Sequence, residues 1–285
     1  GQIRIRNYAA AVNPTDVVAR NGTLAKIQKK NPPPYVPGMD AAGIVDQVGE
    51  GVTTGVKVGD RVMAMVVPKG THGAYREQIV LDQRAVVAAP AGSSHAEACT
   101  LPMNALTARM SLDLLDLEPG QVIAVTGGPG AYGGYVIQLA KADGLMVIAD
   151  AADSDRELLK ALGADIVVSR GDGFAGKIRE HFPQGVDGLA DGALLNARAV
   201  DAVKDGGSFT AIRGFKGEGQ RDIKFTATWV TGYDGAYEKL DLLREQVEGG
   251  ALTLRVAGSV TPEDAGLAHQ RLEQGGTRGR MVIEF

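Results

Sequence analysis

The stretch AVTGGPGAYGG, residues 124–134, decides the fold of this chain. Three of its glycines, Gly128, Gly130 and Gly133, stand at the G-x-G-x-x-G spacing of a dinucleotide-binding turn. In a chain with 39 glycines that spacing is weak evidence by itself, so the residues on either side decide what it means.

The flanking sequence is that of a strand–helix–strand unit. An apolar run at 121–126 predicts a strand before the turn, and an amphipathic run at 132–143 predicts a helix after it. The next apolar run, 145–150, ends on Asp150, at about the place where an acid meets the adenosine ribose of a dinucleotide. The turn is therefore predicted to bind a dinucleotide, and the alternative is a structural turn without a ligand.

Each position of the turn has a predicted role. Gly128 allows the chain to turn tightly, Gly130 lets the backbone approach a pyrophosphate, and Gly133 lets the helix pack close to the strand. The N-terminus of the helix then faces the negative charge of the phosphates. The residues between the glycines complete the predicted cofactor site: Pro129, Ala131 and Tyr132.

The charged residues after the turn leave the choice between NAD and NADP open. Asp150 would accept hydrogen bonds from a ribose 2'-hydroxyl and repel a 2'-phosphate, which favours NAD. Arg156 and Arg170 would instead clamp a 2'-phosphate, which favours NADP. The alternative for both arginines is ordinary charge on a solvated helix and loop.

The rest of the chain predicts an α/β fold in which a β-rich domain is interrupted by a doubly wound parallel sheet. From about residue 120, uniformly apolar runs alternate with helical ones, as in sheets buried on both faces. The first third instead holds short strand-like runs separated by Gly, Pro and Asn, namely 3–12, 41–49, 60–67 and 74–81. The further predicted helices are 153–162, 173–181, 194–203, 234–248 and 262–274, and the predicted boundaries are 1–100, 101–235 and 236–285.

Composition limits the partners and the compartment. The net charge of -4 and the pI near 5.7 argue against nucleic acid as a partner. The chain contains no run of about 18 apolar residues, so the sequence predicts no membrane span. A single cysteine, Cys99, forms no internal disulfide, which fits the reducing cytoplasm, and we expect it to be an inert apolar residue. Residue 1 already lies in a strand-like alternation, so we expect that an N-terminal segment is missing.

In these motifs the chain resembles the medium-chain dehydrogenase/reductase superfamily, and within it the zinc-independent quinone oxidoreductase branch. The resemblance covers nearly the whole length, and its motifs follow in the family's order. It implies a GroES-like catalytic domain and a Rossmann nucleotide-binding domain, with the C-terminus returning to the former. The matching stretches are 9–22, 34–52, 57–64, 100–109, 119–141, 158–165 and 275–285.

The positions that hold zinc in metal-dependent relatives carry other residues here. Asn13 stands in place of a catalytic cysteine, and Gly38-Met39-Asp40 stands in place of Gly-His-Glu. The four histidines are scattered without ligand-like spacing, so we expect no metal site.

The resemblance implies an NAD(P)H-dependent hydride transfer to a quinone or an α,β-unsaturated carbonyl compound, with NADP favoured. Asn13 and Thr107 are implied to border the nicotinamide, with Asn13 also reaching the substrate oxygen. The alternative for Asn13 is an Asx turn before Pro14. Further candidates near the cleft and the nucleotide are Tyr35, His72, Arg278 and Arg280, with loop or strand-edge alternatives for His72 and Arg280. Asp16 is expected to cap the following helix or brace the site.

Two departures and two rival functions stay open. Pro129 and Tyr132 replace smaller residues of the family's turn, so Tyr132 is expected to narrow the pyrophosphate channel or stack on the ligand. The rivals are a zinc-free alcohol or carbonyl reductase of the same fold and a non-catalytic NADPH-binding redox sensor. The resemblance also implies a homodimer, formed through the apolar edge strand 225–232, unless a helix covers that strand.

Overall fold

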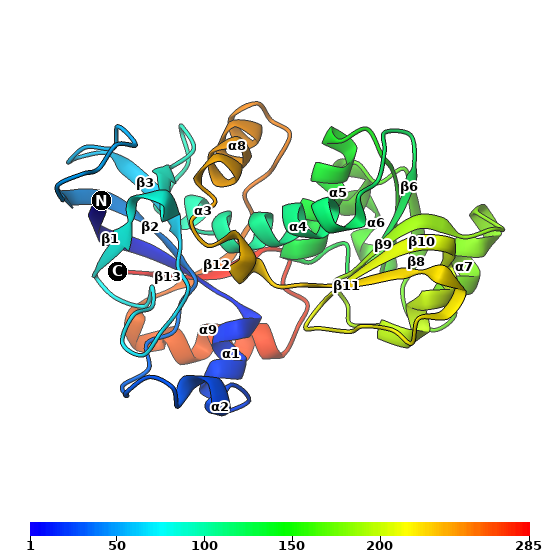
Figure 1. Cartoon of the computed structure of the whole chain (residues 1–285), viewed down its shortest axis with the longest axis horizontal. Helices are drawn as coiled ribbons and strands as arrows, with labels where there is room; N and C mark the ends of the chain where they lie inside the picture. Colours follow the sequence, from blue (N-terminus) through cyan, green and yellow to red (C-terminus); the bar gives the residue numbers. More distant parts are fainter. The chain divides into compact units, whose positions relative to one another are not determined.

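The computed structural model describes residues 1–285 and divides into two compact units. One unit contains residues 1–106 and 231–285, and the other contains residues 107–230 (Figure 1). The chain therefore leaves the first unit, builds the second, and returns to the first.

The first unit is built around a seven-stranded, mainly antiparallel sheet. Its strands are β1 (Gln2–Val12), β2 (Asp40–Val48), β3 (Arg61–Met65), β4 (Gln78–Asp82), β5 (Val86–Ala88), β12 (Val256–Val260) and β13 (Arg280–Glu284). Their order is β12-β13-β1-β2-β3-β5, and β4 also pairs with β1. Only β12 and β13 run parallel to each other, so the C-terminal strands extend the sheet that the N-terminal segment begins.

The four strands expected in the first third are present, with one difference in position. β4 starts at Gln78, although the strand-like run starts four residues earlier. The side-chain amide of Asn7 donates to the carbonyl oxygens of Ala74 and Arg76, at 2.8 and 3.2 Å. These two carbonyl groups accept from the side chain of Asn7 and not from the backbone of β1. The backbone hydrogen bonds that pair β4 with β1 therefore begin only after Arg76.

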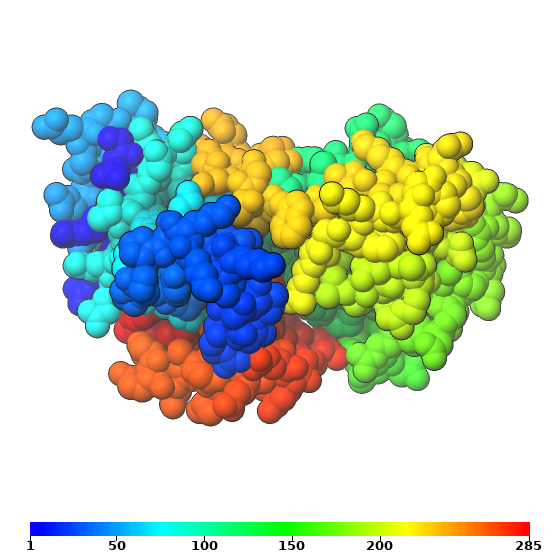
Figure 2. Space-filling view, turned by 60° about the horizontal axis from the view of Figure 1, so that its bottom comes forward, coloured from blue at the N-terminus to red at the C-terminus, as the bar shows by residue number.

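Short helices complete the first unit. They are α1 (Pro14–Arg20), α2 (Ala25–Gln28), α3 (His95–Ala98), α8 (Tyr237–Glu248) and α9 (Ala265–Glu273), with 3-10 turns at Gln83–Ala85, Val230–Tyr233 and Pro262–Asp264. Figure 2 shows the segment that follows β1, in blue, beside the part of the chain near the C-terminus that contains α9, in orange. An ion pair between Arg20 and Glu273, at 2.7 Å, joins these two segments.

The second unit is a doubly wound parallel sheet, as the sequence predicts. Its strands are β6 (Val122–Thr126), β7 (Met146–Ala151), β8 (Ile166–Ser169), β9 (Val186–Asp191), β10 (Val203–Ile212) and β11 (Lys224–Thr228). Their order is β11-β10-β9-β6-β7-β8, and all pairs are parallel. The chain starts in the middle at β6, runs out to β8 and then crosses to β9 on the other side. The strand order therefore reverses between β6 and β9.

The helices of this unit match the predicted ranges with one change of type. They are α5 (Ala131–Ala142), α6 (Arg156–Ala161) and α7 (Phe174–His181), while α4 (Pro102–Leu115) leads into the unit and 3-10 turns lie at Asp153–Asp155 and Gln220–Asp222. The helix expected at 194–203 is a 3-10 helix, Asn196–Ala202. Leu194 and Asn196 have positive φ angles of 58° and 53°, which an α-helix start does not allow.

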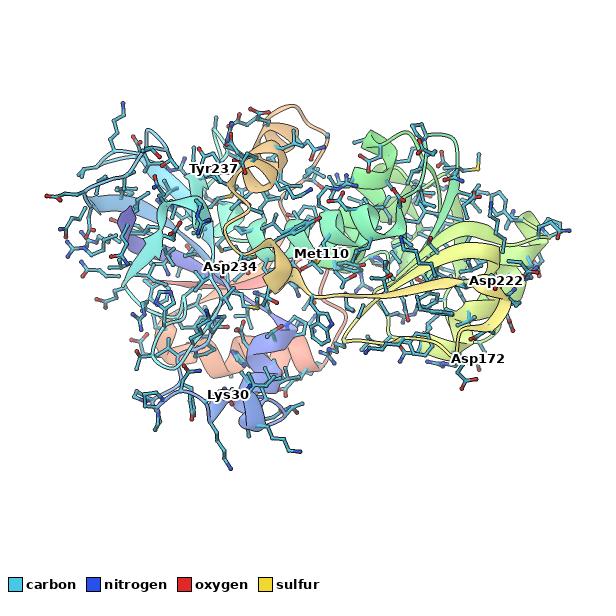
Figure 3. All side chains as sticks on the ribbon, in the orientation of Figure 1. Lys30, Met110, Asp172, Asp222, Asp234 and Tyr237 are labelled. Atoms are coloured by element: carbon cyan, nitrogen blue, oxygen red, sulfur yellow. The ribbon has the colours of Figure 1, made fainter.

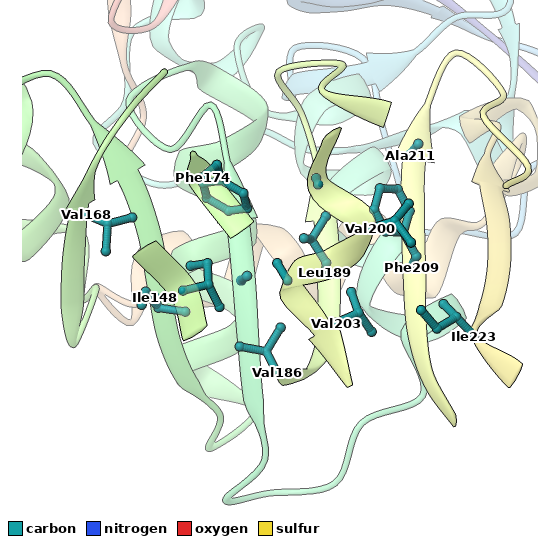
Figure 4. Close-up of a cluster of buried hydrophobic side chains, with 14 residues drawn as sticks. Ile148, Val168, Phe174, Val186, Leu189, Val200, Val203, Phe209, Ala211 and Ile223 are labelled. Atoms are coloured by element: carbon teal, nitrogen blue, oxygen red, sulfur yellow. The ribbon is translucent and has the colours of Figure 1, made fainter. Parts of the chain in front are cut away.

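The core of the second unit explains why its strands are apolar throughout. Side chains from β9 and β10 pack with those of α7 and the 3-10 helix into one buried cluster (Figure 4). Phe209 is fully buried in it and lies against Phe215 and Phe225, with ring centres 5.6 and 5.5 Å away. None of the helices of the chain combines the length and apolar character that crossing a bilayer requires.

Candidate functional site

The candidate cofactor site lies where the strand order reverses, at the carboxyl ends of β6 and β9. In open parallel sheets this switch point is where ligands bind. The hydroxyl of Thr126, at the end of β6, donates to the buried carboxylate of Asp191, at the end of β9, over 2.5 Å. The same carboxylate accepts the backbone N–H groups of Leu195 and Asn196, so Asp191 connects the two loops that leave these strands.

The glycine turn follows β6 directly, and the structure corrects the role of one glycine. The left-handed residue is Gly127, with a φ of +70°, and not Gly128. A Cβ atom on Gly128 would lie 3.0 Å from the end of the Leu159 side chain, so the space at this glycine is tightly packed. A Cβ atom on Gly133 would lie 2.3 Å from the carbonyl oxygen of Gly127, so helix and turn approach each other closely.

Gly130 differs from the other glycines of the turn. It precedes the first residue of α5 with a φ of -66°, which other residues adopt easily. A Cβ atom there would meet only the carbonyl oxygen of Gly127, at 3.2 Å. Internal packing thus demands a glycine at 133 much more strongly than at 130, which is the pattern expected if a ligand needs the space at Gly130.

The Asp150 side chain faces the glycine turn. Its side chain is only 5% exposed, and its carboxylate accepts the backbone N–H of Gly127 over 2.7 Å. Burial raises the pKa of this carboxyl, while the turn's N–H groups and the charge of Arg170 oppose the rise. In this structure Asp150 braces the glycine turn, and a contact with the ribose stays a prediction.

The Tyr132 side chain is buried beneath the glycine turn and does not extend across the side of the turn where a ligand would bind. Its side chain is 8% exposed, and its hydroxyl lies 2.7 Å from the Ser111 hydroxyl, which in turn lies 3.0 Å from that of Thr228. Burial raises the pKa of the phenol, which stays neutral. The expectation that Tyr132 narrows the channel or stacks on the ligand is therefore wrong for this arrangement.

The two arginines that were candidates for a 2'-phosphate lie around the carboxyl ends of β7 and β8. Arg156 donates to the carbonyl oxygen of Val167 over 2.8 Å and lies 4.0 Å from the exposed carboxylate of Asp153. Arg170 follows β8 directly and is exposed. The other predicted cofactor residues lie in different places. Pro129 and Ala131 lie beside Gly130 on the turn, and Thr107 is almost fully buried in α4. Arg278 precedes β13 in the first unit.

The first unit contains a second candidate site, a buried polar cluster around Asn13. The side-chain amide of Asn13 donates to the Asp40 carboxylate over 2.6 Å, and its oxygen accepts from Asn104 over 3.2 Å. Its second donor faces the carbonyl oxygen of Ala11 at 3.4 Å. The fully buried amide is thus used by the protein itself, and the expectation that Asn13 reaches the substrate oxygen is wrong.

Arg280 and Asp16 complete this cluster. Arg280 is buried and donates to the Asn104 side chain, so it is not a strand-edge charge. Asp16 accepts the backbone N–H groups of Asn13 and Gly38, each over 2.8 Å. It therefore caps α1 and braces the segment before β2, as expected.

The two carboxyl groups of the cluster titrate at unusual pH. Burial raises the pKa of Asp40 to about 7 and that of Asp16 to about 6, while hydrogen bonds and the Arg280 charge oppose the rise. Tyr75 places its hydroxyl 3.3 Å from Asp16 and 3.2 Å from the imidazole of His269. Near neutral pH the cluster therefore holds two acids that are close to their protonation midpoints.

A cavity of about 640 Å³ opens next to this cluster in the first unit. Asp16 and Met39 form buried parts of its wall, and Tyr35, which is 39% exposed, also lines it. The Tyr35 hydroxyl donates to the carbonyl oxygen of Asn31 over 3.2 Å. The remaining wall is mostly apolar and contains Leu24, Ile27, Val36, Pro37, Val67 and Pro68. His72 is not part of this wall and lies in a loop.

Several residues of these two sites were missed by sequence reasoning. Asp191, Ser111 and Thr228 organise the switch point, while Asn104 and Tyr75 complete the cluster. The only signal for them was a polar side chain inside an otherwise apolar run, as at the end of VDGLAD. No group of His, Cys, Asp and Glu side chains has the arrangement of a metal site.

Comparison with known proteins identifies the family. Two family models match: an alcohol dehydrogenase GroES-like domain over residues 1–108 and a zinc-binding dehydrogenase over residues 162–283. The chain belongs to the medium-chain dehydrogenase/reductase superfamily, and its predicted place in the zinc-independent branch is confirmed as well.

Three relatives illustrate the similarity. A 2-methylene-furan-3-one reductase of Solanum lycopersicum is 34% identical over 220 residues, and an NADPH-dependent alkenal/one oxidoreductase of Arabidopsis thaliana is 32% identical over 220 residues. Each match covers 75% of this chain but only 55% of the relative, so the chain spans about half the length of these proteins. The structure of an alcohol dehydrogenase superfamily protein from Novosphingobium aromaticivorans superposes with a TM-score of 0.91 at 26% identity, covering 100% of this chain and 92% of that one.

Proposed function

We propose that the chain is an NADPH-dependent reductase of α,β-unsaturated carbonyl compounds or quinones. The observation that supports this most is the glycine turn at the strand reversal, where packing requires Gly133 while Gly130 faces only one protein atom. The two plant relatives, whose names describe reduction of enone and alkenal compounds, support the substrate class.

The residues present fit a dinucleotide. The turn from Gly127 to Gly133 would hold the pyrophosphate against the N-terminus of α5, a helix of 12 residues whose dipole favours negative charge. When bound, a nicotinamide supplies the hydride for the reaction. Asp150 is engaged with the turn, and Arg156 and Arg170, near the carboxyl ends of β7 and β8, favour the 2'-phosphate of NADPH. Thr107 is kept as a residue that borders the nicotinamide.

The first unit would hold the substrate in the cavity beside the Asn13 cluster. The apolar wall excludes water around a hydrocarbon chain, and the Tyr35 hydroxyl could donate to a substrate carbonyl oxygen by exchanging its bond to the carbonyl oxygen of Asn31. In a conjugated carbonyl compound, the charge that develops on hydride addition spreads onto that oxygen. Asn13 contributes through position, because its amide fixes Asp40 while its own backbone N–H is fixed by Asp16.

The direct test is binding of NADPH and NADH by fluorescence titration, followed by their oxidation with 1-octen-3-one and a small quinone. We expect tighter binding of NADPH and steady turnover with the enone. Turnover with saturated aldehydes alone would instead support the alcohol or carbonyl reductase. NADPH binding without turnover of any acceptor would support the redox sensor, and absence of binding of both cofactors would refute the proposed site.

A further inference from the structure

Apart from Thr15, Asp16 and Thr231, the residues that line the 640 Å³ cavity come from two segments that contain no acidic residue. Residues 17–39 contain one arginine and three lysines, and residues 61–76 contain two arginines and one lysine. Neither segment has an Asp or a Glu, although the chain as a whole has a net charge of -4. Positive charge is therefore concentrated around this cavity, against the overall charge of the protein.

The lysines, rather than the arginines, carry the available charge. Arg20 lines the cavity but is paired with Glu273, whereas Arg61 and Arg76 donate to the carbonyl oxygens of Ser93 and Thr71 and do not line it. Lys69 lines the cavity and is exposed, without a carboxylate within ion-pair distance.

Three more lysines lie in a segment that borders the cavity, although they are not themselves part of its wall. Lys26, Lys29 and Lys30 are exposed and without an ion pair, and they belong to the segment 24–31, which supplies four wall residues. Figure 3 shows Lys30 beside α2, well away from Asp234. Negative charge near the wall comes from Asp16, on its buried side, from Glu273, which pairs with Arg20, and from Asp234, which acts on His72.

We propose that the substrate bound in this cavity carries an anionic group, a carboxylate or a phosphate, at the end remote from its conjugated carbonyl. This inference rests on the proposed function for the reacting end of the molecule. The apolar wall suits a hydrocarbon chain, and the volume is in the usual range for a small-molecule site. Lys69 on the wall, with Lys26 in α2 and Lys29 and Lys30 just after it, would then attract the anion where the chain emerges into solvent.

A matched pair of substrates tests the proposal: 8-oxooct-6-enoate and its neutral methyl ester, each reduced with saturating NADPH. We expect kcat/KM for the acid to exceed that for the ester about fivefold at low ionic strength, through KM. At about 0.5 M salt the preference should largely disappear, because exposed charges are then screened. The triple variant Lys29→Ala/Lys30→Ala/Lys69→Ala should lose the preference, so that its kcat/KM values for acid and ester become similar.

The control variant Lys57→Ala/Lys160→Ala/Lys224→Ala removes the same charge from exposed positions elsewhere and should keep the preference. Calorimetric titration with octanoate gives a readout that needs no turnover, with octyl phosphate as the phosphate arm and 1-octanol as the neutral one. One of the two anions should bind more tightly to the unmodified chain. We expect the affinity for that anion to be at least fivefold lower in the triple variant than in the control variant.

The two proposals fail separately. If ester and acid are reduced equally well and neither anion depends on the three lysines, the anionic substrate is refuted while the reductase stands. If neither substrate is reduced but anion binding depends on the lysines, the reductase is refuted while the anion site stands.

Discussion

Replacing two glycines of the same turn by alanine should separate the requirements of folding from those of cofactor binding. Gly133→Ala places a Cβ atom 2.3 Å from the carbonyl oxygen of Gly127 and 2.8 Å from its carbonyl carbon, which are backbone atoms without rotamer freedom. Gly130→Ala places a Cβ atom 3.2 Å from that oxygen and near nothing else, in an allowed backbone conformation.

The magnitudes follow from these contacts. For Gly133→Ala the turn must move by about 1 Å, and overpacking of this kind costs about 1–3 kcal/mol or more, against a gain of about 1 kcal/mol in helix propensity. We therefore expect a net loss of about 2 kcal/mol in the free energy of unfolding. For Gly130→Ala we expect a change below about 0.5 kcal/mol in stability, but at least tenfold weaker NADPH binding, because the methyl group stands where a pyrophosphate approaches the backbone.

Urea unfolding and fluorescence titration with NADPH measure the two effects separately. Gly176→Ala is the matched control, since a Cβ atom there meets nothing within 4 Å in α7, and it should gain up to about 1 kcal/mol without changing NADPH affinity. If Gly130→Ala binds NADPH as tightly as the unmodified chain, the turn does not hold the pyrophosphate and the reasoning fails.

Three further predictions concern buried polar groups. Tyr132→Phe removes the hydroxyl from Ser111 and should lower the free energy of unfolding by about 1 kcal/mol while changing NADPH affinity less than twofold; a tenfold change would mean that the phenol reaches the ligand. Asp150→Asn should weaken NADH and NADPH binding alike through the turn, whereas a selective change for NADH would support the ribose role. Since Asp16 and Asp40 have folded pKa values raised to about 6 and about 7, the stability that their protonation provides is complete below about pH 4 and is lost as the pH rises through those values. Unfolding free energies measured at pH 5 and pH 8 should therefore fall by an amount on the order of 3 kcal/mol, and a flat or rising profile would contradict this assignment.

The doubly wound unit could be predicted because its signal is local. Uniform apolar runs such as 121–126 mark strands buried on both faces, and the alternation with helical runs implies a parallel sheet. The type of the helix near 196 could not be predicted in this way. It depends on left-handed residues at Leu194 and Asn196, and the backbone of this loop is held by the carboxylate of Asp191 at the end of β9, which Thr126 of β6 binds in turn.

The candidate sites were predicted less well, because side-chain direction is a tertiary property. An aspartate at the end of a strand has the same sequence signature whether its carboxylate faces a ribose or, like Asp150, the N–H of Gly127. Asn13 was likewise expected to contact the substrate. In the structure its side-chain amide is hydrogen-bonded to Asp40 and Asn104, which lie far from it in the sequence. Spacing predicted the place of the glycine turn, and the family resemblance implied that of Asn13, but neither could show which atoms remain available there.

Tyr132 shows how a departure from the family's turn is accommodated. A Cβ atom on Gly192 would lie 2.6 Å from the Tyr132 ring and 2.9 Å from the carbonyl oxygen of Thr126, so the large ring occupies space that a glycine leaves open at the end of β9. Gly192→Ala should thus cost more in the unmodified chain than in a Tyr132→Ala background, by about 1–2 kcal/mol in a double-mutant cycle of unfolding free energies. Some cost should remain in both backgrounds because of Thr126. Additive effects would mean that the ring and the glycine are not matched, and that Tyr132 is tolerated through movement of the turn itself.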